Sequence, residues 1–228
     1  LYLQSGEFSA TLKTSLTISG IDATVKGVSW DGINSPWCGD TDQKLYVQSG
    51  QFSATIKASL SVGAVDTLPF GISSDRANTS WCGNEADKLY LQSGQFSSTL
   101  KTSLSVSAVD NIPSGITFDD TNTPWIGSEA NKLYLQSGQF SATLKTSISI
   151  GGVNPTPHGI SWNGNNTPWI GGSTLDKLYL QSGQFSATIK TSLSVNAVDD
   201  DPTGIETDDF DARVPTILST FIPKVILF

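Results

Sequence analysis

The stretch Lys44-Leu-Tyr-Val-Gln-Ser-Gly-Gln-Phe-Ser-Ala-Thr-Ile-Lys57 recurs along the whole chain as a series of near-copies. The copies begin at Leu1, Leu45, Leu89, Leu133 and Leu178. The intervals between these residues are 44, 44, 44 and 45 residues, a period that is typical of blade-repeat and solenoid proteins. In a chain of 228 residues, an unbroken repeat of this kind favours a single closed domain.

Turn signals divide each period into four short segments. Residues 159–195, which surround Leu178, illustrate the pattern. Residues 159–162 and 167–170 flank an Asn-Gly turn, residues 177–181 follow, and a long alternating segment covers residues 185–195. Asn-Gly turns favour antiparallel hairpins, and alternation with period two predicts strands. No apolar pattern with a period of 3.6 residues is present, which excludes a helical repeat. A parallel β-helix is the weaker alternative.

We therefore predict an all-β fold, a five-bladed β-propeller with four antiparallel strands in each blade. Four blades are expected at residues 21–64, 65–108, 109–152 and 153–197. A composite fifth blade is expected to join residues 1–20 to residues 203–219, with its second strand within Arg213–Ser219, so that the two termini close the ring. Residues 220–228 form an apolar tail, interpreted as a packed segment, the cut end of a longer polypeptide, or a strand that docks on another subunit.

The composition limits the classes of partner. The formal net charge is −8 and only 15% of residues are charged, so nucleic acid and anionic membrane surfaces are not expected as partners. No apolar run approaches the roughly 20 residues that span a bilayer. The two cysteines, Cys38 and Cys82, lie one period apart and are expected to be small buried residues without a disulfide or metal.

Few residues have the chemistry of a catalytic site. His158 is the only histidine and is expected in a solvated loop, so neither a zinc site nor a catalytic triad has obvious components. The recurring carboxylates at Asp22, Asp66 and Asp110 are interpreted as turn caps, and no calcium-loop motif is present. The sequence therefore predicts no catalytic residues, no metal and no cofactor.

A tryptophan that follows an asparagine by three residues recurs in four copies and is the strongest candidate for ligand binding. An indole beside amide groups can stack on a sugar while the amides bind its hydroxyls. The alternative is that the indoles fill the gaps between blades, as is also expected of Trp30 and Trp162. The candidate ligand-binding residues are Trp37, Trp81, Trp125, Trp169, Asn34, Asn78, Asn122 and Asn166.

The order Pro-x-Gly-Ile-x-x-Asp, Asn-Thr-Pro-Trp, Asp-Lys-Leu-Tyr resembles blades of NHL and gluconolactonase-like β-propellers. The resemblance covers all five copies and implies the fold alone. Gluconolactonase-like enzymes hold a divalent metal on the axis through acidic and amide side chains, and no unrepeated set of such residues is evident here. The near-identity of the copies also resembles the repetitive propeller-like proteins of bacteriophages and environmental viruses.

These observations lead us to expect a non-enzymatic, multivalent binding module. It would be a lectin-like or receptor-binding part of a viral particle, virion-associated or extracellular, with a glycan or cell-surface receptor as its partner. The alternative is a structural or assembly protein of a virion or fibre, in which the ring is a scaffold and residues 220–228 dock on other subunits. An enzyme with an axial metal is the third possibility.

Overall fold

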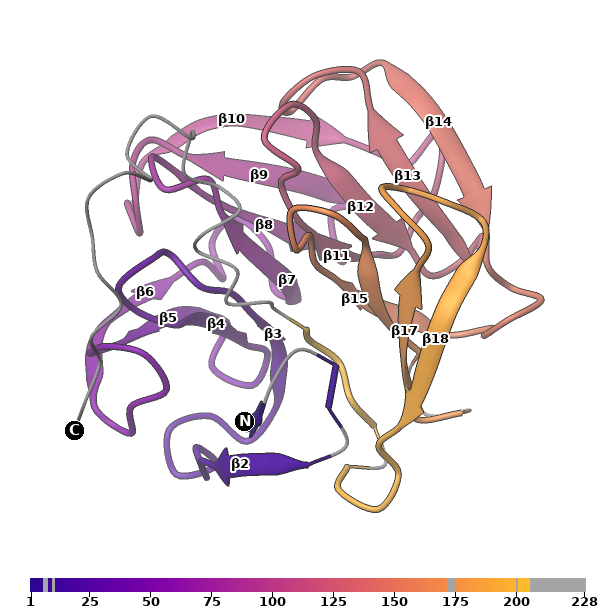
Figure 1. The fold of residues 1–228 in the computed structure, drawn as a ribbon. Helices are drawn as coiled ribbons and strands as arrows, with labels where there is room; N and C mark the ends of the chain where they lie inside the picture. Colours follow the sequence, from indigo (N-terminus) through magenta and orange to yellow (C-terminus); the bar gives the residue numbers. More distant parts are fainter. Residues whose placement is uncertain (6–7, 10, 172–174, 200, 206–228) are drawn as a thin grey trace, which may run out of the picture.

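The structure is a computed structural model that describes residues 1–5, 8–9, 11–171, 175–199 and 201–205. It is an all-β propeller built from four-stranded antiparallel blades, together with a small sheet at the N-terminus (Figure 1). The expected second strand of the composite blade, within residues 213–219, and the tail at 220–228 lie outside the described residues.

Each of the four blades consists of four consecutive strands that pair in sequence order. The first two blades contain β3 (Val25–Val28), β4 (Pro36–Gly39), β5 (Lys44–Gln48) and β6 (Ile56–Ser61), then β7 (Pro69–Ser74), β8 (Thr79–Gly83), β9 (Lys88–Gln92) and β10 (Leu100–Ser105). The next two contain β11 (Pro113–Ile116), β12 (Pro124–Gly127), β13 (Lys132–Gln136) and β14 (Leu144–Ser149), then β15 (Pro157–Ile160), β16 (Pro168–Gly171), β17 (Lys177–Gln181) and β18 (Ile189–Ser194).

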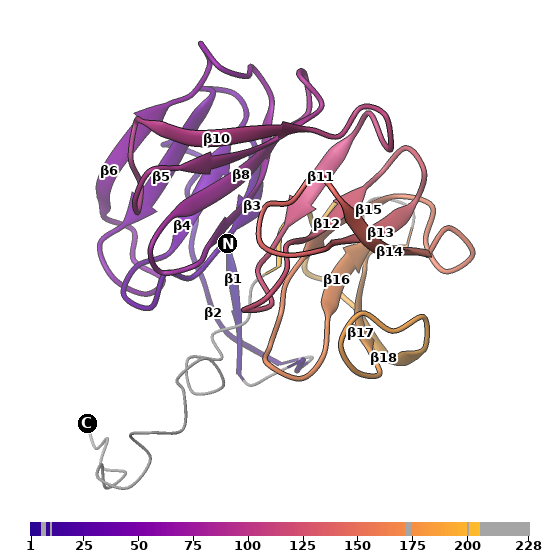
Figure 2. The same ribbon diagram turned by 90° about the horizontal axis from the view of Figure 1, so that it is seen from above.

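The N-terminal sheet pairs β1 (Tyr2–Gln4) with β2 (Leu12–Ser15). Ile18, which follows β2, forms a buried cluster with Trp37 and Tyr46 of the first blade, and Leu1 and Leu16 pack against that cluster. The N-terminal sheet thus lies beside the first blade, on the side opposite β7–β10 (Figures 1 and 2).

Packing between blades forms most of the core. One cluster joins Cys82 and Leu89 of the second blade to Ile116, Trp125 and Tyr134 of the third. Equivalent clusters join the first blade to the second and the third to the fourth. The middle strands are therefore buried on both faces, and the burial of their aromatic side chains supplies much of the stability.

The inner strands approach one another most closely at a glycine. A Cβ on Gly71 would lie 2.8 Å from Gly115 Cα, and a Cβ on Gly159 would lie 3.0 Å from Gly204 Cα. A Cβ on Gly204 would in turn lie 2.9 Å from Gly27 Cα. Residues 203–205 thus lie between β15 and β3, and only glycine allows backbones to come so close.

The long strand expected at residues 185–195 is shorter in the structure and begins at Ile189. Phe185 has a φ of +48°, and its N–H donates to Thr167 Oγ1 at 3.0 Å. The N–H of Thr188 donates to Ser186 Oγ. Side-chain oxygens therefore satisfy backbone donors that a strand ladder would use, which delays the start of the strand.

Candidate functional site

The four tryptophans of the repeat are buried, and each stacks on a tyrosine of the neighbouring strand. Each of their side chains is 0% exposed. Trp125 and Tyr134 have ring centroids 4.2 Å apart with an interplanar angle of 18°, and the other three pairs are equivalent. The indoles fill the space between blades, so the structure does not place Trp37, Trp81, Trp125 and Trp169 where a sugar could stack on them.

The asparagines of the same candidate set connect two turns on one face of the propeller. Asn122 receives a backbone hydrogen bond from Gly138 at 3.1 Å, and its own amide donates to Asp119. Asn34, Asn78 and Asn166 accept the same bond from Gly50, Gly94 and Gly183. The turn between the first and second strands of each blade therefore lies on the same face as the turn between the third and fourth strands. Because the asparagine oxygens already accept backbone bonds, their main role is to hold the turns together.

Thr123 completes this connection and has counterparts in every blade. Its Oγ1 accepts the backbone N–H of Phe140 at 2.8 Å. Phe140 has a φ of +52°, a conformation that costs energy for a bulky residue and that this hydrogen bond helps to offset. The side chain of Phe140 packs against the cluster between the second and third blades. The two turns are therefore one rigid unit in each blade.

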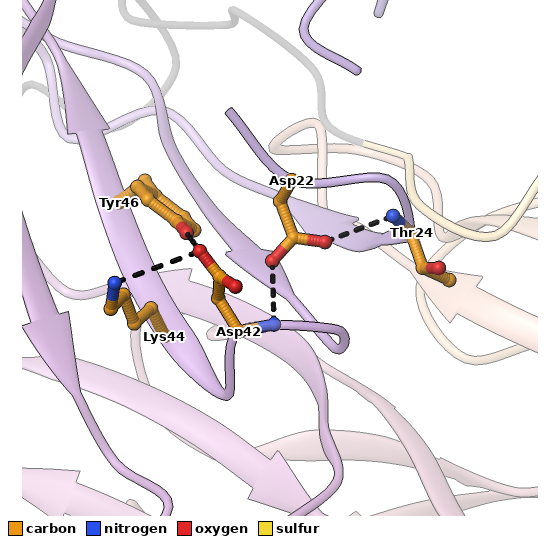
Figure 3. A network of polar contacts seen from close by, with 5 residues as sticks. All are labelled: Asp22, Thr24, Asp42, Lys44 and Tyr46. Atoms are coloured by element: carbon orange, nitrogen blue, oxygen red, sulfur yellow. Dashed lines mark hydrogen bonds and ion pairs between the residues drawn. The ribbon is translucent and has the colours of Figure 1, made fainter. Parts of the chain in front are cut away.

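The opposite face is organised by buried carboxylates, as the first blade illustrates (Figure 3). Asp22 accepts hydrogen bonds from the backbone N–H groups of Thr24 at 2.9 Å and Asp42 at 3.1 Å. Asp42 in turn accepts from the Tyr46 hydroxyl at 3.1 Å and lies 3.6 Å from Lys44 Nζ. The carboxylate thus ties the segment that enters the blade to the turn between β4 and β5.

Asp66 and Asp110 perform the same role in the next two blades. Asp110 accepts from the N–H groups of Ile112 and Ala130, both at 2.9 Å. Burial, reinforced by the charge of the adjacent aspartate, raises the pKa of Tyr90 to about 12 and does the same for Tyr134. The interpretation of these aspartates as turn caps is confirmed, with the addition that each carboxylate also holds a second loop.

Both cysteines are free and buried. Burial raises the pKa of the Cys82 thiol to about 12 and raises the pKa of the Cys38 thiol well above its ordinary value. Their thiols are therefore protonated and unreactive at neutral pH.

The expectation of a solvated loop for His158 is wrong. His158 lies in β15 and is partly buried. Its imidazole centroid lies 5.6 Å from the ring centroid of Phe70, a residue of the inner strand β7, two blades away. Lys26, Phe70 and His158 are equivalent residues, each immediately before the glycine of an inner strand. Lys26 and Phe70 were not among the candidate residues, although the residue at this position differs in every copy of the repeat.

In the part of the chain that the structure describes, no group of three or more His, Cys, Asp or Glu side chains is arranged to hold a metal ion. Within the same residues, no helix is long and apolar enough to cross a membrane.

The chain resembles several solved propellers in structure. A glutaminyl cyclase from Myxococcus xanthus matches with a TM-score of 0.64 at 12% identity, covering 82% of each chain. A streptogramin B lyase matches with a TM-score of 0.54 at 16% identity, covering 85% of this chain and 62% of the lyase. A chain of a nidogen–laminin complex matches with a TM-score of 0.57 at 14% identity, covering 83% and 70%. Identities this low establish the propeller fold alone. No protein family and no curated protein matches the sequence.

Proposed function

We propose that the chain is a non-enzymatic, multivalent binding module that presents the same polar surface on the outer strand of each blade. We call this surface the rim strip. It comprises a Thr-x-Lys-x-Ser segment in which the threonine, lysine and serine are exposed. The five copies cover residues 11–15, 55–59, 99–103, 143–147 and 188–192.

The observation that carries this proposal is the retention of exposed residues in the rim strip while several exposed positions elsewhere in the repeat differ. Thr67 is exposed, and the equivalent exposed residues of the next two blades are Asn111 and Pro155. The exposed Thr41 corresponds to Glu85 in the second blade. Exposed substitutions usually change stability by less than about 0.5 kcal/mol, so folding alone does not require five identical lysines. A shared binding requirement accounts for their retention.

Hydroxyl and ammonium groups on a rigid strand provide directed hydrogen bonds of the kind that recognise the hydroxyls of a carbohydrate. The spacing of the strips around a rigid propeller favours a repeated ligand, because several weak sites then act together through a high effective concentration. These features support a glycan of a cell surface as the ligand class. A viral origin rests on the repetitive character of the sequence alone.

Glycan-array binding by the full chain tests this function. Replacing Lys57, Lys101, Lys145 and Lys190 with alanine is expected to reduce apparent affinity about 100-fold or more, because avidity is lost together with each contact. The matched control replaces the four lysines that begin the third strand of each blade: Lys44, Lys88, Lys132 and Lys177. Both variants lose four positive charges, so the control keeps the charge constant and is expected to bind like the wild type. Equal losses in the two variants, or no glycan binding by the wild type, would contradict the proposal.

We also propose that the propeller is closed as five blades. The N-terminal sheet would supply the outer strands of the fifth blade, and the segment around Gly204 would supply its inner strand. Thr203 Oγ1 donates to the carbonyl of Val25 at 2.9 Å, which connects this segment to the first blade. A groove of about 1010 Å³ separates the N-terminal sheet from residues 201–205 and β16–β18. The second strand expected at residues 213–219 lies outside the described residues.

An assembly role is the second candidate, and one observation favours it. Exposed apolar residues recur on the face that carries the buried carboxylates, where Val65 and Val109 are 42% and 40% exposed and Leu68 and Ile112 lie near them in sequence. Repeated apolar positions suit contacts between subunits. The docking segment expected at residues 220–228 lies outside the described residues. The glycan experiment separates the two candidates, since an assembly protein would bind no glycan.

A further inference from the structure

One position of the repeat carries a different residue in every copy, namely the residue that precedes the inner-strand glycine. The glycine itself is present in all five copies, and the buried aromatic pairs are copied as well. The variable residues are Lys26, Phe70, Ser114, His158 and Thr203. In a chain that otherwise repeats its interior so closely, five unlike residues at one equivalent position indicate a local role that the blades do not share.

Three of these side chains meet across the centre of the propeller. Lys26 Nζ lies 5.0 Å from the ring centroid of Phe70. The Phe70 ring centroid lies 5.6 Å from that of His158, with an interplanar angle of 32°. Phe70 and His158 belong to β7 and β15, which are separated by the inner strand β11. Their contact therefore spans the position of β11, whose equivalent residue is the small Ser114.

The glycines form a floor beneath these side chains. The space among the inner strands at this level is only about 10 Å³, which is room for about one water molecule. We call the cluster of Lys26, Phe70 and His158 the axial mouth; of the three residues, Lys26 lines this small space. The Ser114 hydroxyl lies 2.7 Å from Ser128 Oγ, and Thr203 donates to Val25, so the protein itself already uses both hydroxyls.

The charge of Lys26 is not paired with a carboxylate of a described residue, although the charge of Asp201 reaches His158. Lys26 is partly buried, and no ion pair between it and another described residue is found. An ammonium withdrawn from water is normally paired with an acid, and a cation–π contact supplies only about 0.5–2 kcal/mol.

His158 adds a neutral polar group to the mouth. Burial lowers the pKa of His158 and the charge of Lys26 lowers it further, against an opposing effect of Asp201, so the imidazole is neutral at pH 7. Its Nδ1 is buried and has no hydrogen-bond partner among the described residues. The mouth thus combines an unpaired cation, an aromatic ring and a neutral imidazole.

We propose that the axial mouth formed by Lys26, Phe70 and His158 binds a small carboxylate that carries an aromatic or apolar body. The carboxylate pairs with the Lys26 ammonium, the body packs on the Phe70 ring, and the imidazole hydrogen-bonds to the ligand. This site is independent of the rim strips, because its residues lie at the centre of the propeller.

The single histidine makes the test direct, because its Cε1–H gives one isolated proton NMR signal. Benzoate, titrated into the full chain at pH 7, is expected to shift the His158 signal along a saturable curve. Benzyl alcohol, which has the same ring without the charge, is expected to bind at least tenfold more weakly. The Lys26→Gln variant is expected to lose at least tenfold in benzoate affinity, and the matched Lys132→Gln variant is expected to lose none.

Two outcomes would overturn the proposal. The first is a His158 signal that does not shift with benzoate, which would make the three side chains a packing cluster only. The second is an equal response to benzoate and benzyl alcohol in the wild type, which would show that the charge of Lys26 plays no part. The second comparison needs no variant, so it holds even if Lys26→Gln disturbs folding.

Discussion

Gly71→Ala is expected to destabilise the protein by about 3 kcal/mol, at the upper end of the range for overpacked sites. The added Cβ would lie 2.8 Å from Gly115 Cα and 3.1 Å from the carbonyl oxygen of Ser114. Both atoms are backbone atoms of the next inner strand, so neither can move aside by a change of rotamer. The two blades must instead separate, which opens the buried cluster that joins them.

Gly152→Ala is the matched control, because nothing lies within 4 Å of a Cβ at Gly152. There the substitution is expected to be neutral or to stabilise by up to about 1 kcal/mol through a less flexible unfolded chain. Urea unfolding at 25 °C, followed by tryptophan fluorescence, measures both variants. Equal stabilities of the two variants would contradict the close approach of the inner strands.

Trp125→Ala is expected to cost about 3–5 kcal/mol of unfolding free energy. The indole is 0% exposed, stacks on Tyr134 and packs against Cys82 and Leu89 of the preceding blade. Its removal leaves a cavity between two rigid sheets, which cannot collapse into the space without bending.

Ile33→Ala serves as the control for this substitution, because Ile33 is 70% exposed and its truncation is expected to change stability by less than about 0.5 kcal/mol. Chemical denaturation followed by far-UV circular dichroism compares the two. A Trp125→Ala variant as stable as Ile33→Ala would mean that the indole is not part of the core. The expected cost also means that a loss of binding in this variant would report on folding rather than on ligand contact.

The blade architecture could be predicted from the sequence because the period and the turn residues are local signals. Asn163-Gly164 marks a hairpin whatever surrounds it, and the 44-residue spacing repeats that hairpin around an axis. The role of the tryptophans could not be predicted in the same way. Pro124–Gly127 is buried at every position, so alternation does not reveal which side chain faces the next blade and which faces solvent.

The axial mouth was beyond prediction for a different reason. Phe70 and His158 come from blades that are not neighbours, and their contact depends on how far each inner strand projects toward the axis. The sequence shows that the position before each glycine varies, but only the three-dimensional arrangement places Lys26 against Phe70. The start of the outer strand at Ile189 was also hidden, because the hydrogen bond from Phe185 to Thr167 connects residues 18 positions apart.

The proposed five-bladed closure requires five inner segments around the axis, with the segment around Gly204 next to Gly27. Nuclear Overhauser effects between glycine Hα protons measure this directly. We expect contacts from Gly27 to Gly71, from Gly71 to Gly115, from Gly115 to Gly159, from Gly159 to Gly204, and from Gly204 back to Gly27. A spectrum that shows the first three contacts but lacks those of Gly204 would describe an open arc of four blades and would contradict the account.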